Sequence, residues 1–69
     1  MYEQIITEEH ARDIALQEVP GDIQKVGMDL EYGIIFYKFT ILTEDDKRFK
    51  VLVNARSGQV IGVREKSVD

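Results

Sequence analysis

The side chains best suited to chemistry in this sequence are few and isolated. His10 is the only histidine, and its imidazole is the group best suited to acid–base work near neutral pH. A catalytic triad or a metal centre needs several groups that converge on one point. The chain has no cysteine, no second histidine and no His-Glu-x-x-His spacing. We therefore predict that His10 is an ordinary helix residue and that the chain has no catalytic and no metal-binding residues.

The acidic run Glu44-Asp45-Asp46 is the second candidate for chemistry, because carboxylates are ligands that Ca²⁺ prefers. The run lacks the alternating ligands and the downstream glutamate of an EF-hand loop, which favours a solvated hairpin loop. The five glycines are dispersed and do not form a phosphate-binding loop at a helix start. Ser57 has no neighbouring base in the sequence. We therefore expect no cofactor and a protein that is not an enzyme.

The composition indicates a small globular protein. A chain of 69 residues can form one hydrophobic core, and a core of this size rarely supplies more than about 3–5 kcal/mol of stability. Hydrophobic residues make up 43% and charged residues 32%, which is too apolar for disorder and too charged for a membrane span. The first residues lack the features of a signal peptide, so we expect a soluble chain without membrane insertion. Since there is no cysteine, the compartment stays unassigned.

The net charge of -4 bears on the class of partner. Acidic residues are scattered from end to end, whereas proteins that bind nucleic acid concentrate Lys and Arg on one face. The sequence therefore argues against a nucleic-acid partner.

One helix is predicted to begin after Thr7, whose hydroxyl can cap the first turn. Glu8 and Glu9 follow at positions where the helix dipole favours negative charge. An apolar stripe with helical spacing consists of Ala11, Ile14, Ala15 and Val19. Pro20-Gly21 is expected to end the helix, because proline disfavours helical geometry in the residue before it.

After Pro20-Gly21 the apolar pattern changes from helical to alternating, which predicts strands. The predicted strands cover residues 23–31, 35–41, 49–53 and 59–64, with turns at Tyr32-Gly33, 43–47 and 54–58. Because these connections are short, neighbouring strands should be antiparallel. The predicted fold class is α+β, with one N-terminal helix packed on one face of a four-stranded antiparallel meander sheet. We expect a single domain over residues 1–69 with a core of about 6–64.

The expected core residues are Ile6, Ala11, Ile14, Ala15, Val19, Val26, Met28, Leu30, Tyr37, Phe39, Ile41, Phe49, Val51, Val53, Ile61 and Val63.

The sheet face opposite the helix is the candidate protein-binding surface. If the core residues alternate strictly along the strands, the residues that point outward are Ile34, Phe36, Leu52 and Val60. One interpretation is that these are scattered surface residues among Lys38, Thr40, Arg48 and Lys50. The other is that they form a patch covered by a second copy, an adjoining domain or a protease.

The sheet edges, at residues 23–31 and 59–64, are a second route to a partner. An extended peptide can pair with an edge strand through backbone hydrogen bonds. Lys25, Gly27 and Arg64 on these edges favour the opposite interpretation, that the edges are protected against pairing.

Four segments together resemble the PepSY family. They are Thr7-Glu8-Glu9-His10-Ala11, Ile14-Ala15-Leu16, Tyr37-Lys38-Phe39-Thr40-Ile41 and Asn54-Ala55-Arg56-Ser57-Gly58-Gln59-Val60. The family pattern opens a helix with Thr-Glu-Glu-x-Ala and ends on an Asp-Ala-x-Thr-Gly-x-Val turn. Asn54 and Ser57 replace the usual Asp and Thr, and both keep a side-chain acceptor that a turn can use. The resemblance implies the α+β fold predicted above.

The resemblance also implies a function. PepSY domains occur in propeptides of thermolysin-type proteases and in cell-envelope or secreted proteins, where the proposed role is to inhibit or regulate a peptidase. We therefore expect a non-enzymatic protein-interaction module that regulates or inhibits a peptidase. The alternative is a structural, self-associating domain that forms a homodimer through the outer sheet face without inhibitory activity.

Overall fold

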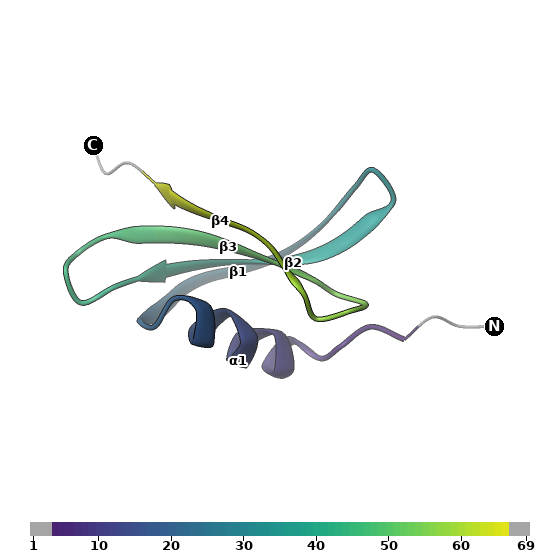
Figure 1. Cartoon of the computed structure of the whole chain (residues 1–69), viewed down its shortest axis with the longest axis horizontal. Coiled ribbons are helices and arrows are strands. Elements are labelled where there is room, and N and C mark those ends of the chain that lie inside the picture. Colours follow the sequence, from purple (N-terminus) through teal and green to yellow (C-terminus); the bar gives the residue numbers. More distant parts are fainter. Residues whose placement is uncertain (1–3, 67–69) are drawn as a thin grey trace.

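A computed structural model describes residues 4–66 of the chain, and these residues form one helix and four strands (Figure 1). The elements are α1 (Glu8–Glu18), β1 (Asp22–Glu31), β2 (Ile34–Leu42), β3 (Arg48–Asn54) and β4 (Val60–Lys66). The strands are antiparallel to their neighbours and follow the order β1-β2-β3-β4, with α1 on one face of the open sheet. The predicted α+β meander is confirmed.

Local side chains fix both ends of α1. The Thr7 hydroxyl accepts a hydrogen bond from the His10 backbone N–H at 3.1 Å, as expected for an N-cap. At the other end the Val19 N–H donates to the Ala15 carbonyl at 2.9 Å, and Val19 itself is extended. An extended Val19 follows from its place before Pro20. The predicted start and end of the helix are therefore confirmed.

The turns between strands also follow their sequence signals. Tyr32 and Gly33 both have positive φ, at 53° and 77°, as a tight hairpin turn requires. Asn54 Oδ1 accepts from the backbone N–H groups of Arg56 and Ser57, at 2.8 and 3.1 Å. The side-chain oxygen of Asn54 therefore stabilises the turn between β3 and β4. Asparagine accepts these hydrogen bonds at the position where the family usually has aspartate.

The core lies between α1 and the two central strands. Ala11 and Ala15 are fully buried, and their small side chains let the helix approach the sheet closely. The largest fully buried side chains are Phe39, Ile41, Val51 and Val53. Tyr37 stacks on Phe39 with ring centroids 6.1 Å apart, and its hydroxyl donates to the Ile6 carbonyl at 2.7 Å.

Three predicted core residues lie on the helix side of the sheet but are exposed. Met28 and Leu30 are opposite Tyr37 and Ile35 in the β1–β2 register, yet they are 47% and 62% exposed. The helix approaches β2, β3 and β4 but not β1, so this half of the edge strand stays uncovered. Val63 pairs with buried Val51 but lies on the other edge strand and is 43% exposed. The prediction of burial was wrong because alternation identifies a face but not how far the helix covers it.

A bulge in β4 reverses two further predictions. Val53 pairs with Val60, whereas Leu52 pairs with Gly62, so Ile61 is an extra residue in the strand. Val60 packs against the core, although strict alternation placed it on the outer face. Ile61 is 44% exposed and lines a groove on the outer face, although it was expected in the core. One extra residue shifts the alternation by one position, and side chains therefore change faces.

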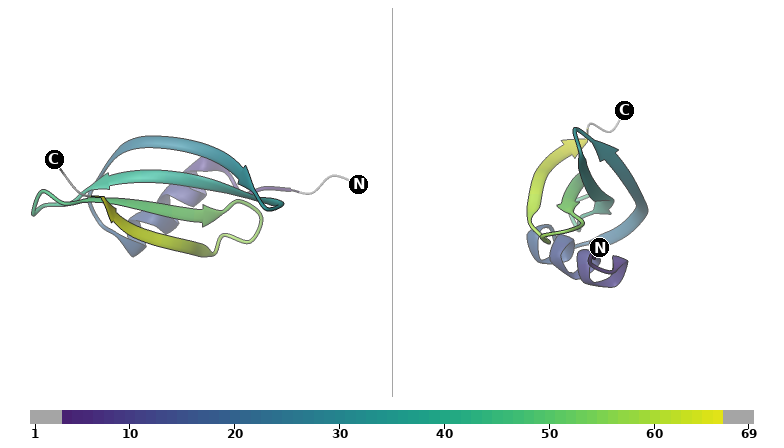
Figure 2. Two further views of the ribbon diagram at one scale, coloured as in Figure 1. Left: turned by 90° about the horizontal axis from the view of Figure 1, so that it is seen from above. Right: turned by 90° about the vertical axis from the view of Figure 1, so that its right-hand side faces the viewer.

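The sheet is curled, with its hollow side turned away from the helix. Viewed along the long axis, the two edge strands β1 and β4 lie on opposite sides and α1 lies beneath them (Figure 2). Residues of both edges, among them Asp29 and Arg64, line one groove. Because β2 and β3 separate these edges in the sheet, a shared groove requires that the sheet bend around it.

Candidate functional site

The main hollow on the outer face is a groove of 370 Å³, which we call the sheet groove. Its floor is formed by β2 and β3 and its walls by β1 and β4. The residues that matter below are Asp29, Phe36, Lys38, Lys50, Leu52, Ile61 and Arg64. Ligand sites in proteins have volumes of about 300–1,000 Å³, so the groove is large enough for a few side chains of a partner.

The apolar part of the groove contains two of the four residues predicted from sequence. Phe36 and Leu52 both line it, with Phe36 only 6% exposed and Leu52 half-buried. Ile34 lies on the same face nearer the β1–β2 turn, opposite Glu31, and is 41% exposed. Val60 packs against the core on the helix side, whereas Ile61 lines the groove together with Phe36 and Leu52.

Ile61 is the residue that the alternation pattern missed. The only local signal was Gly62 in the middle of the predicted strand, because glycine inside a strand often marks a bulge. Gly62 also leaves space on the outer face, where a Cβ atom would lie 3.6 Å from Leu52 Cδ1. The bulge and the glycine therefore both shape the wall of the sheet groove.

Asp29 and Lys38 form an ion pair in the groove wall, with Nζ and Oδ2 3.3 Å apart. Asp29 Oδ1 also accepts a hydrogen bond from the Leu30 backbone N–H at 2.9 Å. The Leu30 N–H, followed by the Lys38 ammonium, lowers the pKa of the Asp29 carboxyl from its ordinary value. The pair is exposed, so solvent weakens it and its effect on stability is small.

This arrangement predicts how Asp29 titrates. Its pKa should lie below the ordinary value of about 3.9, and Lys38→Gln should raise it only partly because the hydrogen bond from the Leu30 N–H remains. The folded pKa is the lower one, so the stabilisation from Asp29 is present above the unfolded pKa and is lost as the pH falls through the folded pKa. An NMR titration of the Asp29 carboxyl tests this. A pKa at or above the ordinary value would contradict it.

The other candidates for chemistry do not converge on a site. His10 is exposed in the first turn of α1, and the acidic run at 44–46 lies in the β2–β3 hairpin loop, as predicted. In that loop the Thr43 hydroxyl accepts from the Lys47 N–H at 3.2 Å. Within residues 4–66, no group of three or more His, Cys, Asp or Glu side chains is arranged to hold a metal ion.

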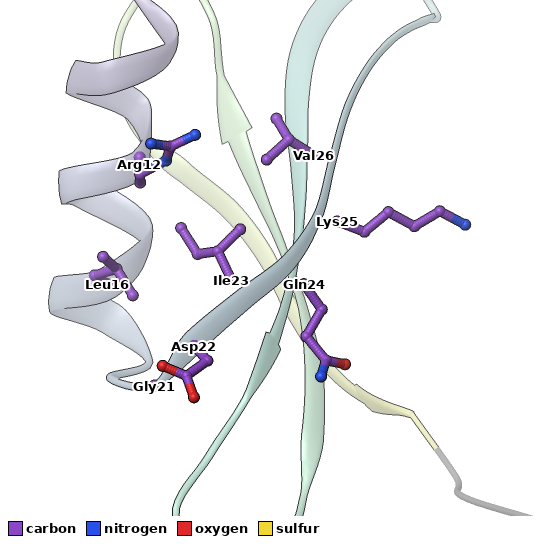
Figure 3. Close-up of a pocket in the computed structure, with 8 residues that line it drawn as sticks. All are labelled: Arg12, Leu16, Gly21, Asp22, Ile23, Gln24, Lys25 and Val26. Carbon is purple, nitrogen blue, oxygen red and sulfur yellow. The ribbon is translucent and has the colours of Figure 1, made fainter.

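A second hollow of 400 Å³ separates α1 from β1 (Figure 3). Arg12 and Leu16 border it from the helix and Ile23 from the strand, while Lys25 points away from it. The Arg12 guanidinium pairs with Glu8 at 2.8 Å, and its Nε atom is buried without a hydrogen-bond partner in the described chain. This cleft follows from the position of α1, which leaves the β1 edge uncovered.

The fold defines a class of protein: a small α+β domain with one helix on an open, curled antiparallel sheet. Residues 5–64 match the model of the PepSY family, "Peptidase propeptide and YPEB domain", and the chain belongs to this family. The resemblance found in the sequence is thereby confirmed. PepSY domains are generally regulatory, non-catalytic modules.

A solved structure supports the same assignment. The chain is similar to a "putative lipoprotein" from Clostridium difficile 630, with 27% sequence identity and a TM-score of 0.86. The match covers 96% of this chain and 43% of that protein, so the chain spans less than half the length of its structural relative. Among curated proteins, none matches this sequence significantly. No helix within residues 4–66 is long and apolar enough to cross a membrane.

Proposed function

We propose that this protein is a non-enzymatic module that binds a protein partner through the sheet groove and thereby regulates or inhibits a peptidase. The observation that supports this proposal is the groove itself, a concave sheet face whose floor contains Phe36 and Leu52, inside a domain of the PepSY family. We further propose that residues 1–69 act as a single module with its core at about 6–64. The similarity to a lipoprotein of Clostridium difficile supports a role at the cell envelope.

The two apolar residues that a partner would contact are Leu52 and Ile61. Ile61 is 44% exposed and Leu52 is half-buried, so both have surface left to bury, whereas Phe36 has almost none. Apolar contacts in a pocket sheltered from water contribute most to protein interfaces. Phe36 is therefore a buried part of the groove floor, and Leu52 and Ile61 provide the apolar surface that a partner contacts.

Inhibition of a thermolysin-type protease is the assay that tests this proposal. Ile61→Asp should weaken inhibition about tenfold or more, because it replaces an apolar contact with a carboxylate that must lose its water on binding. Met28→Asp is the matched control, since Met28 is 47% exposed on the other edge strand and on the helix side. Equal loss in both variants, or no inhibition by the wild type, would contradict the proposed role.

Self-association through the same groove is the second candidate. It is favoured by the exposed apolar surface of Ile34 and Ile61 on one face of a protein of this size. Light scattering over a range of concentrations should then give a dimer for the wild type and a monomer for Ile61→Asp. A wild type that is monomeric throughout would exclude this candidate and leave the groove to a different partner.

A further inference from the structure

The outer sheet face is basic, although the chain as a whole has a net charge of -4. In the strand register Lys25 lies opposite Thr40, Thr40 opposite Lys50, and Lys50 opposite Arg64. Three cations therefore share one row across all four strands. Paired residues of antiparallel strands present their side chains on the same face. Six of the nine Lys and Arg residues lie on this face by register: Lys25, Lys38, Arg48, Lys50, Arg64 and Lys66.

Most of these cations form no ion pair with the described part of the chain. Lys38 pairs with Asp29, but within residues 4–66 the other five basic residues of this face make no ion pair. The acidic residues of the same face are Asp22, Asp29 and Glu31, and the last two lie toward the β1–β2 turn. The sheet face therefore has an apolar and acidic end near that turn and a basic end away from it.

A smaller hollow on the outer face lies between the basic residues and the sheet groove. It has a volume of 180 Å³ and is lined by Lys25, Lys38, Lys50 and Lys66 together with Thr40. Lys38 and Lys50 line both hollows, so the two are adjacent. An extended segment along the strands would therefore meet Leu52 and Ile61 first and the row of Lys25, Lys50 and Arg64 next.

We propose that this face binds an acidic, extended peptide segment that places an apolar side chain on Leu52 and Ile61 and its carboxylates on the basic row. This inference rests on the proposed function and adds the chemistry of the partner. Charge complementarity selects the partner, because an acidic segment is attracted to a row of unpaired cations and a basic one is repelled. The curled shape favours a narrow chain over a flat membrane surface, which would meet only the edge strands. Phe36 is buried, so the groove offers no exposed ring on which nucleic-acid bases could stack.

Fluorescence anisotropy with three labelled peptides tests the inference. The probes are a Glu-rich peptide with one central Leu, the same peptide with Lys in place of Glu, and the Glu-rich peptide with Ala in place of Leu. The first should bind the wild type best, the second should not bind, and the third should bind more weakly. Raising the salt concentration from about 50 to 200 mM should weaken binding of the first, because salt screens exposed charges.

A charge-reversed pair of variants locates the site. Lys50→Glu should weaken binding of the Glu-Leu peptide about tenfold, whereas Lys47→Glu, in the 43–47 loop, should leave it nearly unchanged. Equal loss in both variants would mean that only net charge matters and would overturn the inference. Tighter binding of anionic lipid vesicles or of single-stranded DNA than of the peptide would overturn it as well.

These outcomes are separable from those of the proposed function. Peptide binding without inhibition of a protease would contradict the peptidase role and support the acidic partner. Inhibition that is lost in Ile61→Asp but kept in Lys50→Glu would contradict the acidic partner and support the peptidase role.

Discussion

Phe36→Asp is expected to unfold most of the protein. The Phe36 ring is only 6% exposed, on the floor of the sheet groove between Asp29 of β1 and Asn54 of β3. Truncation of a buried phenylalanine costs about 3–5 kcal/mol, and the new carboxylate must also lose part of its hydration. The nearby Lys38 is already paired with Asp29 and compensates little. The expected cost approaches the whole stability of about 3–5 kcal/mol for a core of this size.

Urea unfolding followed by circular dichroism measures this effect, with Ile34→Asp as the matched control. Ile34 lies on the same strand and the same face but is 41% exposed, so its replacement should cost about 1 kcal/mol or less. Identical unfolding midpoints for Phe36→Asp and the wild type would show that the ring is not buried in solution. Because Phe36 is needed for stability, binding through the groove has to be tested with substitutions at Leu52 and Ile61 instead.

Gly21→Ala is expected to be the second strongly destabilising change. A Cβ atom at Gly21 would lie 2.4 Å from the Leu42 carbonyl oxygen and 2.8 Å from Ile41 Cγ2. This oxygen belongs to Leu42, which forms the first pair of the β1–β2 ladder with Asp22, so it cannot move without disturbing the sheet. Overpacking of this kind costs about 3 kcal/mol at the upper end of its usual range. The variant should therefore show a much lower urea midpoint than the wild type.

Gly27→Ala is the control for Gly21→Ala. A Cβ atom at Gly27 would meet only the flexible Lys38 Cε, at 3.6 Å, which is an ordinary contact. Because alanine has less conformational entropy to lose than glycine, this change should be neutral or stabilise the strand by about 0.5–1 kcal/mol. If both variants lost stability equally, the close approach of Gly21 to β2 would not be the cause.

The curled sheet links these stability predictions to the proposed binding site. Phe36 is buried although it points away from the helix, because both edge strands curve around it. The same curvature brings Asp29 of β1 and Arg64 of β4 to one groove. A partner that occupied the groove would contact all four strands, so binding should also stabilise the folded state, by an amount that rises with the logarithm of ligand concentration once the site is saturated.

The sequence by itself determined the local elements of this protein. The helix cap at Thr7, the stop at Pro20, the turn at Tyr32-Gly33 and the side-chain acceptor of Asn54 act over a few residues, and the structure has each as predicted. Short connections then left an antiparallel meander as the simplest order of strands. These features are encoded locally, so one sequence is enough to find them.

Which apolar residues line the sheet groove depends on tertiary structure. Alternation assigned the two faces correctly along β2 and β3, but the bulge at Ile61 placed Val60 against the core and left Ile61 exposed at the wall of the sheet groove. Coverage of Met28 depends on where α1 crosses the sheet, and burial of Phe36 depends on how far the sheet curls. The basic row is likewise a product of register, since Lys25, Lys50 and Arg64 are distant in sequence and meet only across paired strands. Bulge, coverage, curl and register are relations between strands, and a pattern read along one strand does not contain them.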